Sequence, residues 1–217
     1  MSNPITMDWD RTARTGLSEA VMCKGKTPAL LQHILALAEA KCEALLFTKL
    51  EPAAVVSLSC GSGRFDYDEI SRTAIYTPAQ HTGPSRNDRI AVISGGSTDI
   101  PVAKEAVRTL GFYGVAATEV YDIGVAGLWR LHEKLPLLRE HKILICVAGM
   151  DAALPTVLAG LVSSLIIAVP TSTGYGMARD GETALNALLC SCGQGLVVVN
   201  IDNGFGAACA AMRVLAG

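Results

Sequence analysis

The clearest structural signal is the stretch Arg89-Ile-Ala-Val-Ile-Ser-Gly-Gly-Ser-Thr-Asp99, in which a short β-branched run ends at small and polar residues. Four similar runs follow along the chain, and helix-compatible segments separate them. Such near-continuous apolar runs are typical of buried parallel strands, and the segments between them are long enough for crossover helices. The later runs cover residues 114–120, 142–147, 165–170 and 195–201, and the expected helices cover 99–110, 125–139, 154–163, 182–192 and 207–215. The sequence therefore predicts an α/β fold, a three-layer sandwich built on a parallel sheet.

Residues 1–85 do not show this alternation. Apolar residues at helical spacing predict one helix over residues 28–46, with Thr27 as its N-cap and Pro28 as its first residue. Residues 77–88 are rich in proline, glycine and polar side chains, which is typical of a linker. We therefore expect a small helical or mixed N-terminal domain over residues 1–85 and a second domain over 86–217, with the boundary near Ser85.

The composition excludes several classes of protein. Half of the 217 residues are hydrophobic and 18% are charged, which excludes a disordered chain. Lys and Arg number 18 against 20 Asp and Glu, so the chain lacks the basic excess that neutralises a nucleic-acid backbone. The most apolar window, residues 157–170, is shorter than the roughly 18–20 residues that a membrane span needs. The opening residues lack the apolar core of a secretion signal, and we therefore expect a cytoplasmic protein without nucleic-acid or membrane partners.

The cysteines favour a reducing compartment. There are seven, an odd number, and they form no Cys-x-x-Cys pair, so neither a disulfide framework nor a zinc site is predicted. Cys192 is the strongest candidate nucleophile, because Gly193 and Gly195 suit a left-handed helix end that turns it toward the ligand-binding edge or a subunit interface. A buried apolar thiol is the common alternative, and the carboxyl end of a helix disfavours a thiolate. A cationic substrate ring beside the sulfur would supply the missing positive charge.

In an open parallel sheet, ligands bind beyond the carboxyl ends of the strands. The first strand is followed there by a loop whose small residues expose backbone N–H groups at a helix N-terminus, and whose hydroxyls add further donors. This loop, which contains Gly95, Gly96, Ser97, Thr98 and Asp99, fits a phosphate, although a plain turn with Asp99 as the helix cap also explains it. It matches neither the Walker loop nor the dinucleotide fingerprint.

The loops after the other strands are also rich in glycine, hydroxyl and carboxylate groups. Asp122 is either a helix cap or a contact to a ribose or base. The polar residues after the fifth run are too costly to bury unless a ligand or a neighbouring subunit pairs with them. The chain has four histidines and none in these loops, so neither a serine triad nor a multi-histidine metal site is predicted. The remaining candidates in these loops are Asp151, Thr171, Ser172, Thr173, Tyr175, Asn200, Asp202 and Asn203.

Taken together, the loops resemble those of the LarB family, the nickel-pincer nucleotide carboxylase/hydrolase. The resemblance rests on Gly95-Gly-Ser-Thr-Asp-Ile-Pro-Val-Ala103, Asp122-Ile-Gly-Val-Ala-Gly-Leu128, Ala148-Gly-Met-Asp-Ala-Ala-Leu-Pro155, Pro170-Thr-Ser-Thr-Gly-Tyr-Gly176, the pair Ser191-Cys192, and Asn200-Ile-Asp-Asn-Gly-Phe-Gly-Ala-Ala208. The segments Asp10-Arg-Thr-Ala-Arg-Thr-Gly16, Glu19 and Gly25-Lys-Thr-Pro28 are similar to that family's opening motif. The second domain is similar, more distantly, to PurE, which implies a flavodoxin-like sheet and a homo-oligomer, an octamer.

The resemblance implies a reaction on nicotinic acid adenine dinucleotide. The pyridinium ring is carboxylated with carbon dioxide or bicarbonate, and hydrolysis of the phosphoanhydride gives AMP and pyridinium-3,5-biscarboxylic acid mononucleotide. The resemblance also implies that Cys192 forms a cysteinyl-pyridine intermediate, with Asp122 and Asp151 as catalytic carboxylates. Arg130 and the loop residues 95–99, 171–175 and 200–203 then contact the substrate. Any Mg²⁺ is expected to bind with the substrate phosphates and not in a cage of protein side chains.

Three positions depart from the family's usual pattern. Trp129 stands where a histidine is usual, Asp151-Ala152 where Glu-Gly is usual, and Lys49 where an arginine is usual. One alternative is a PurE-like carboxylase or mutase acting on aminoimidazole ribonucleotide. Its chemistry depends on a histidine in the loop after the second strand, where this chain has Tyr121-Asp-Ile-Gly-Val. The second alternative is a catalytically inactive nucleotide-binding oligomer, and the third is a redox sensor that uses Cys190 and Cys192.

Overall fold

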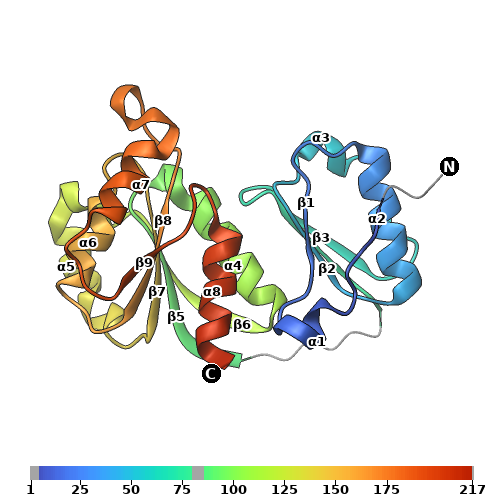
Figure 1. Cartoon of the computed structure of the whole chain (residues 1–217), viewed down its shortest axis with the longest axis horizontal. Coiled ribbons are helices and arrows are strands. Elements are labelled where there is room, and N and C mark those ends of the chain that lie inside the picture. Colours follow the sequence, from blue (N-terminus) through green and yellow to red (C-terminus); the bar gives the residue numbers. More distant parts are fainter. Residues whose placement is uncertain (1–4, 80–85, 217) are drawn as a thin grey trace. The chain divides into compact units, whose positions relative to one another are not determined.

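Two separate sheets organise the chain (Figure 1). The computed structural model describes residues 5–79 and 86–216, and the chain divides into the units Met1–Gly83 and Pro84–Gly217. The domain boundary predicted near Ser85 lies outside the described residues. Each unit has its own hydrophobic core, and each is described by itself below.

The sheet of the carboxyl-terminal unit has five strands in the order β6-β5-β7-β8-β9, and every neighbouring pair is parallel. The central strand β7 is buried along its whole length, because apolar residues occupy both of its faces. The strands are β5 (Arg86–Ser94), β6 (Val115–Val120), β7 (Ile143–Ala148), β8 (Leu165–Pro170) and β9 (Leu196–Val198). The predicted parallel sheet is confirmed.

Helices cover both faces of this sheet, α4 and α8 one face and α5, α6 and α7 the other (Figure 1). Each helix packs on the sheet through an apolar face. In helix α5 this face is formed by Leu131, Leu135 and Leu138, which recur at helical spacing and are buried. The helices are α4 (Ile100–Phe112), α5 (Leu128–Leu138), α6 (Ala153–Ala159), α7 (Glu182–Leu189) and α8 (Gly204–Ala216), with 3-10 turns η1 (Ser97–Asp99), η2 (Val125–Gly127) and η3 (Gly176–Gly181). The α/β three-layer sandwich is therefore confirmed. Within residues 5–79 and 86–216, no helix combines the length and the apolar character that crossing a membrane requires.

The connection from α7 to β9 differs from the prediction. Helix α7 ends at Leu189, and the next residue, Cys190, has a φ of −94° instead of the left-handed conformation expected for the helix end. The left-handed residue is Gly195, with a φ of 77°, and it lies directly before β9. Cys192 consequently lies in a loop and not at the last turn of a helix.

The amino-terminal unit is built on a mixed sheet in the order β1-β2-β4-β3, where only β1 and β2 are parallel. Its elements are α1 (Arg11–Thr15), β1 (Ala20–Met22), α2 (Pro28–Lys41), β2 (Leu45–Thr48), α3 (Pro52–Val55), β3 (Arg64–Asp68) and β4 (Thr73–Thr77). The unit is of the mixed kind, although the sequence pattern predicted one helix and none of these strands.

The predicted helix over residues 28–46 begins where expected and ends early. Thr27 caps it by accepting a hydrogen bond from the Leu30 N–H at 3.3 Å, and Pro28 is its first residue. Cys42, with a φ of 54°, ends the helix, and Leu46 belongs instead to β2, where it pairs with Ile75. The prediction was wrong there because a short apolar run buried on both sides looks the same in a helix and in a strand.

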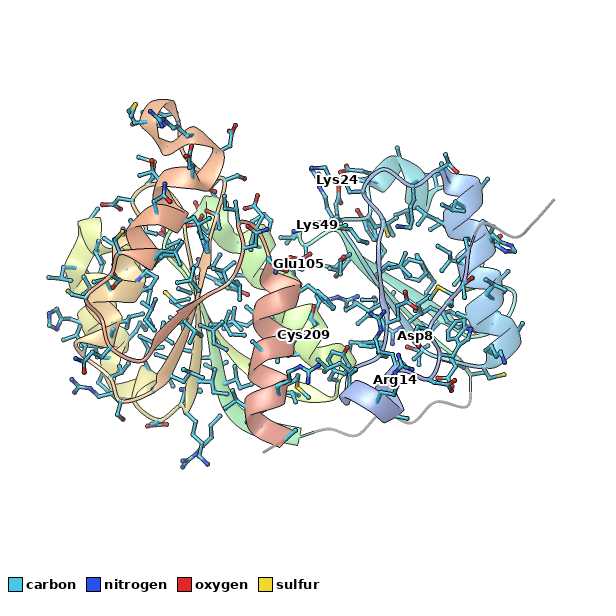
Figure 2. The ribbon with its side chains drawn as sticks, viewed as in Figure 1. Asp8, Arg14, Lys24, Lys49, Glu105 and Cys209 are labelled. Atoms are coloured by element: carbon cyan, nitrogen blue, oxygen red, sulfur yellow. The ribbon has the colours of Figure 1, made fainter. Side chains whose placement is uncertain are left out.

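The opening motif has a structural role within the amino-terminal unit (Figure 2). The Asp8 carboxylate accepts hydrogen bonds from Arg11 Nε at 3.1 Å and from Arg14 Nη2 at 2.6 Å. The Asp8 N–H donates to the Glu19 carboxylate at 2.6 Å, which ties α1 to the segment that leads into β1. The hydrogen bonds from Arg14 and Arg11 hold the pKa of Asp8 below its usual value.

Candidate functional site

The candidate site is a pocket at the carboxyl ends of β5, β6, β7 and β8. The chain runs from β5 to β6 on one side and then returns past β5 to β7, so the strand order reverses at this point. Open α/β sheets bind ligands at such a switch point. The pocket has a volume of about 510 Å³, which is within the range of small-molecule sites.

Nine of the predicted site residues line this one pocket, although they come from four different loops. They are Gly95, Gly96, Thr98 and Asp99 after β5, Asp122 and Arg130 after β6, Asp151 after β7, and Thr173 and Tyr175 after β8. The parallel sheet brings these loops together because it aligns the carboxyl ends of its strands.

The loop after β5 differs in detail from the prediction that its glycine amides bind a phosphate. The Gly95 N–H donates to the Val147 carbonyl at 2.8 Å, and the Gly96 N–H donates to Asp99 Oδ2 at 2.9 Å. Both glycine amides are therefore engaged within the fold. The hydrogen bonds among the described residues use neither the Ser97 nor the Thr98 amide, which open η1 and lead into α4. These two amides are the donors that this helix start can offer to an anion.

Asp99 holds two loops together. The residue is 4% exposed. Its Oδ2 accepts the hydrogen bond from the Gly96 N–H, and its Oδ1 accepts a second one from Thr171 Oγ1 at 2.6 Å. Thr171 is fully buried and does not line the pocket. Asp99 and Thr171 thus position the loops after β5 and β8, and the substrate contact predicted for Thr171 is not available in this geometry.

Asp122 and Arg130 form an ion pair in the pocket, with Arg130 Nη1 at 2.8 Å from Asp122 Oδ2. The backbone of Asp122 is held in the left-handed region, at a φ of 57°, by a hydrogen bond from its N–H to Ser94 Oγ at 3.0 Å. The guanidinium lies against Gly127, where a Cβ atom would come within 2.7 Å of Arg130 Nε. The pair therefore presents a fixed cation and a carboxylate to a ligand.

Asp151 is the pocket carboxylate that the fold engages least. Its Oδ1 accepts one long hydrogen bond, from the Ala153 N–H at 3.4 Å, and its side chain is exposed. Asp99 and Asp122 are both held by short bonds to other side chains. Of the three carboxylates, Asp151 is therefore the one best placed to accept a proton or to bind a cation from a ligand.

The loop after β8 forms the outer wall. The Met150 N–H donates to the Thr173 carbonyl at 2.9 Å, and a Cβ atom on Gly149 would lie only 2.5 Å from that carbonyl oxygen. The glycine is required for the loops after β7 and β8 to approach this closely. Beyond Thr173 the chain projects away from the sheet edge through η3 (Figure 1, orange), and Tyr175 at its base is 82% exposed.

Three polar residues predicted to need a ligand or a subunit neighbour have backbone partners instead. Asp202 Oδ1 accepts from the Ser172 N–H at 2.9 Å, Asn203 Oδ1 from the Gly206 N–H at 2.8 Å, and Asn200 Oδ1 from the Ile201 N–H at 2.9 Å. These residues do not line the pocket, nor do Ser97, Ser172 and Cys192. Each of the three side chains thus has a hydrogen-bond partner within the chain, and the loop after β9 does not need an outside partner to explain its polar residues.

Cys192 is exposed, whereas two other thiols are protected by burial. Burial raises the pKa of Cys23 to about 12, and it also raises the pKa of the fully buried Cys146 in β7. Neither can supply a thiolate near neutral pH. Cys192 lies outside the pocket, in the loop between α7 and β9.

The residues that sequence reasoning missed are small or apolar and lie in the same loops as the predicted ones. They line the walls of the pocket with backbone atoms and with small or apolar side chains. A search of the sequence for reactive side chains does not detect such residues. They are Gly124, Val125, Ala126, Ala148, Gly149, Met150, Ala152, Ala153, Leu154 and Gly174. No group of three or more His, Cys, Asp or Glu side chains suited to a metal ion occurs in the described part of the chain.

Comparisons with known proteins cover both units. Residues 89–217 match the AIR carboxylase family, and residues 3–78 match the LarB/PurE-like N-terminal domain. An uncharacterized protein of Methanocaldococcus jannaschii is 38% identical over 210 residues, which cover 94% of this chain and 80% of that protein. The N5-carboxyaminoimidazole ribonucleotide mutase of the same organism is 34% identical over 134 residues, which cover 58% of this chain and 78% of the mutase.

A solved structure shares the fold. The crystal structure of a PurE2 variant from Treponema denticola matches with a TM-score of 0.50 and 19% identity, covering 62% of this chain and 81% of that chain. The chain therefore belongs to the AIR carboxylase family, and a LarB/PurE-like N-terminal domain precedes its AIR carboxylase domain.

Proposed function

We propose that the chain carboxylates the pyridinium ring of nicotinic acid adenine dinucleotide and hydrolyses the phosphoanhydride, giving pyridinium-3,5-biscarboxylic acid mononucleotide and AMP. The observation that supports this most is the convergence of anion donors, the Asp122–Arg130 pair and Asp151 in one pocket. The LarB/PurE-like N-terminal domain supports the LarB reaction over that of a mutase, because the match to the mutase of Methanocaldococcus jannaschii covers 58% of the chain. We place the protein in nickel-pincer nucleotide biosynthesis and in the cytoplasm.

In this proposal, different residues of the pocket bind different groups of the substrate. The amide and the hydroxyl of Thr98 bind a phosphate of the nucleotide at the start of η1 and α4. Arg130 neutralises a second anionic group, because its guanidinium is fixed by Asp122 and offers further N–H donors. Thr173 and Tyr175 bound the region where the ring and its carboxylate lie.

The chemistry requires a nucleophile because a cationic pyridinium cannot itself attack carbon dioxide. The Cys192 thiolate adds to the ring carbon para to nitrogen, and the ring electrons move to nitrogen, which makes the neighbouring carbon enamine-like. That carbon attacks carbon dioxide and forms the new C–C bond. Asp151 then takes the proton from the same carbon, and expulsion of the thiolate restores the aromatic ring. Electrons and atoms balance without an oxidant.

Mg²⁺ fits the pocket as an ion shared with the substrate. Asp151 offers an exposed carboxylate, and the described residues provide no further acidic cluster, so the phosphates would complete the coordination. The ion would neutralise the pyrophosphate during anhydride cleavage. The protein itself would hold the phosphate at Thr98 and would exclude other orientations of the substrate.

The test incubates the purified full chain with nicotinic acid adenine dinucleotide, bicarbonate and Mg²⁺ and identifies the small molecules by mass spectrometry. We expect AMP and a mononucleotide with one additional carboxyl group. Cys192→Ser should abolish carboxylation, and Cys190→Ser, two residues away and also exposed, is the matched control that should retain it. Full carboxylation by Cys192→Ser would refute the role of this cysteine.

A second candidate is the reaction of the curated relatives, N5-carboxyaminoimidazole ribonucleotide mutase, because two of them are 34% and 31% identical over 134 and 138 residues. Against it, the loop after β6 that lines the pocket carries Asp122, Gly124, Val125 and Ala126 and has no histidine. The same assay with N5-carboxyaminoimidazole ribonucleotide distinguishes the two. A folded protein that binds the dinucleotide without turnover would instead support an inactive nucleotide-binding oligomer.

A further inference from the structure

The loop that carries Cys192 is fastened to helix α6 by the hydroxyl group of Ser191. Ser191 Oγ shares a hydrogen bond with Thr156 Oγ1 in α6, with 2.7 Å between the two oxygens. The same Ser191 Oγ accepts a hydrogen bond from the Gly193 N–H at 3.0 Å. One oxygen atom therefore joins a helix side chain to the residues on both sides of Cys192.

The bond from the Gly193 N–H to Ser191 Oγ closes a turn with Cys192 as its middle residue. Serine hydroxyls form such side-chain turns with the N–H group two residues later, and the turn fixes the local backbone. This turn packs closely against α6, because a Cβ atom on Gly193 would come within 2.7 Å of the Ala159 Cβ. The backbone of Cys192 is thus held on both sides, although the residue itself is exposed.

Helix α6 is a rigid support for this contact. It packs on the sheet through Leu154 and Leu158, which are both buried in the hydrophobic core. Ala153 and Leu154, at the start of the helix, also line the pocket. The same short helix therefore carries part of the pocket wall at its first turn and, at Thr156, the anchor of the loop with Cys192.

We propose that Thr156 is a positioning residue for the Cys192 thiol and that it acts through Ser191. The inference rests on the proposed function, in which the Cys192 sulfur bonds to the ring. A nucleophile must be held at a defined place for that step, because a displacement of about 1 Å can lower a rate roughly a hundredfold. Thr156 takes no part in the bond changes. It orients the Ser191 hydroxyl, which in turn holds the backbone of Cys192.

The contact depends on the Thr156 hydroxyl and not on the size of the side chain. A serine hydroxyl has one proton and two lone pairs, so Ser191 Oγ can bond Thr156 and the Gly193 N–H at the same time. Without the Thr156 hydroxyl, the Ser191 side chain loses the partner that fixes its rotamer, and the Gly193 N–H loses a fixed acceptor.

Two variants of Thr156 separate the hydroxyl from the packing of the side chain. Thr156→Val keeps the shape and removes the hydroxyl, whereas Thr156→Ser keeps the hydroxyl and removes a methyl group. In the carboxylation assay we expect Thr156→Val to lower kcat about tenfold and to leave KM for the dinucleotide within about twofold, because the thiol acts after the substrate has bound. Thr156→Ser is the matched control and should keep the kcat of the wild type. Equal losses in the two variants would assign the effect to packing and overturn the proposal.

A double-mutant cycle tests whether Thr156 acts through Ser191. Ser191→Ala alone should lower kcat by a factor similar to that of Thr156→Val. The double variant should be no slower than Ser191→Ala, because both changes remove the same hydrogen bond. Effects that multiply in the double variant would contradict the coupling of the two residues.

Hydrogen exchange at the Gly193 amide, measured by NMR, tests the same contact without substrate. We expect this amide to exchange about tenfold faster in Thr156→Val, because its acceptor is no longer fixed, and at the wild-type rate in Thr156→Ser. An unchanged exchange rate in Thr156→Val would overturn the proposal. If the wild type does not carboxylate the dinucleotide, the proposed reaction is refuted, and faster exchange in Thr156→Val would still support the positioning of Cys192 by Thr156.

Discussion

Thr171 Oγ1 donates a 2.6 Å hydrogen bond to Asp99 Oδ1, and this bond joins two loops that are 72 residues apart in the chain. Both side chains are buried, and the second Asp99 oxygen accepts from the Gly96 N–H at 2.9 Å. This hydrogen bond fixes the loop after β5 against the loop after β8. Thr171 is buried behind the pocket and Asp99 lines it, so the geometry of the pocket depends on a contact made partly behind its surface.

Thr171→Val removes the donor while keeping the shape of the side chain. The Asp99 carboxylate stays buried with one partner fewer, and we expect a loss of about 1–3 kcal/mol in the free energy of unfolding. Thr173→Val is the matched control, because Thr173 is half-buried at the pocket and does not contact Asp99. Urea denaturation measures both. Equal losses in the two variants would contradict the role given to the Asp99–Thr171 bond.

Gly149→Ala should disrupt the pocket, because the new Cβ atom would lie 2.5 Å from the Thr173 carbonyl oxygen and 2.6 Å from Thr171 Oγ1. Because the clash is with the backbone of Thr173, it can be relieved only if the loop after β8 moves. Gly160→Ala is the control, since its Cβ would make an ordinary contact of 3.6 Å with the Val157 carbonyl. We expect a lower melting temperature and weaker dinucleotide binding for Gly149→Ala. Unchanged binding would show that the glycine is not needed there.

Arg130→Lys tests whether the planar guanidinium matters. A lysine keeps the positive charge but cannot bond Asp122 and a ligand anion through one rigid fork. We expect the dissociation constant for the dinucleotide to rise about tenfold, equivalent to about 1.4 kcal/mol. Isothermal titration calorimetry gives the value. Lys134, on the same helix, provides the control as Lys134→Arg, because it does not line the pocket. Equal affinities for wild type and Arg130→Lys would exclude a direct anion contact.

Alkylation should separate the thiols by burial. Burial raises the pKa of Cys23 from its usual value near 9.0 to about 12, so at pH 8 its thiolate fraction falls by roughly three orders of magnitude. We expect iodoacetamide at pH 8 to modify the exposed Cys42 and Cys190 quickly, and Cys23 and Cys146 only after unfolding. Peptide mass spectrometry measures the extent of modification at each cysteine. Rapid modification of Cys146 in folded protein would contradict its placement inside β7.

The carboxyl-terminal sheet could be predicted because each buried strand carries its own local signal. Strand β8 begins at Leu165 and ends at Pro170, as expected from its apolar run and proline. The amino-terminal unit carries weaker signals. The buried run at Leu46 fits helix and strand equally, and only its pairing with Ile75, a long-range contact, decides between them.

The site was predictable in outline for the same reason, since a parallel sheet must gather the loops after its strands. The partners of individual polar groups were not predictable. Asp202 takes its hydrogen bond from the Ser172 backbone, and Asp99 takes one from Thr171 across the site, and neither pairing has a local sequence signal. The position of Cys192 was also hidden, because it depends on how Ser191 contacts Thr156 in another helix.

The central claim is that this pocket attaches a carboxyl group to a pyridinium dinucleotide, and isotope incorporation tests it most directly. The full chain is incubated with nicotinic acid adenine dinucleotide, Mg²⁺ and ¹³C-bicarbonate, and the mononucleotide product is analysed by mass spectrometry. The account predicts a product that carries one labelled carboxyl group together with an equal amount of AMP. AMP formed with an unlabelled mononucleotide, or an unchanged dinucleotide in the presence of folded protein, would contradict it.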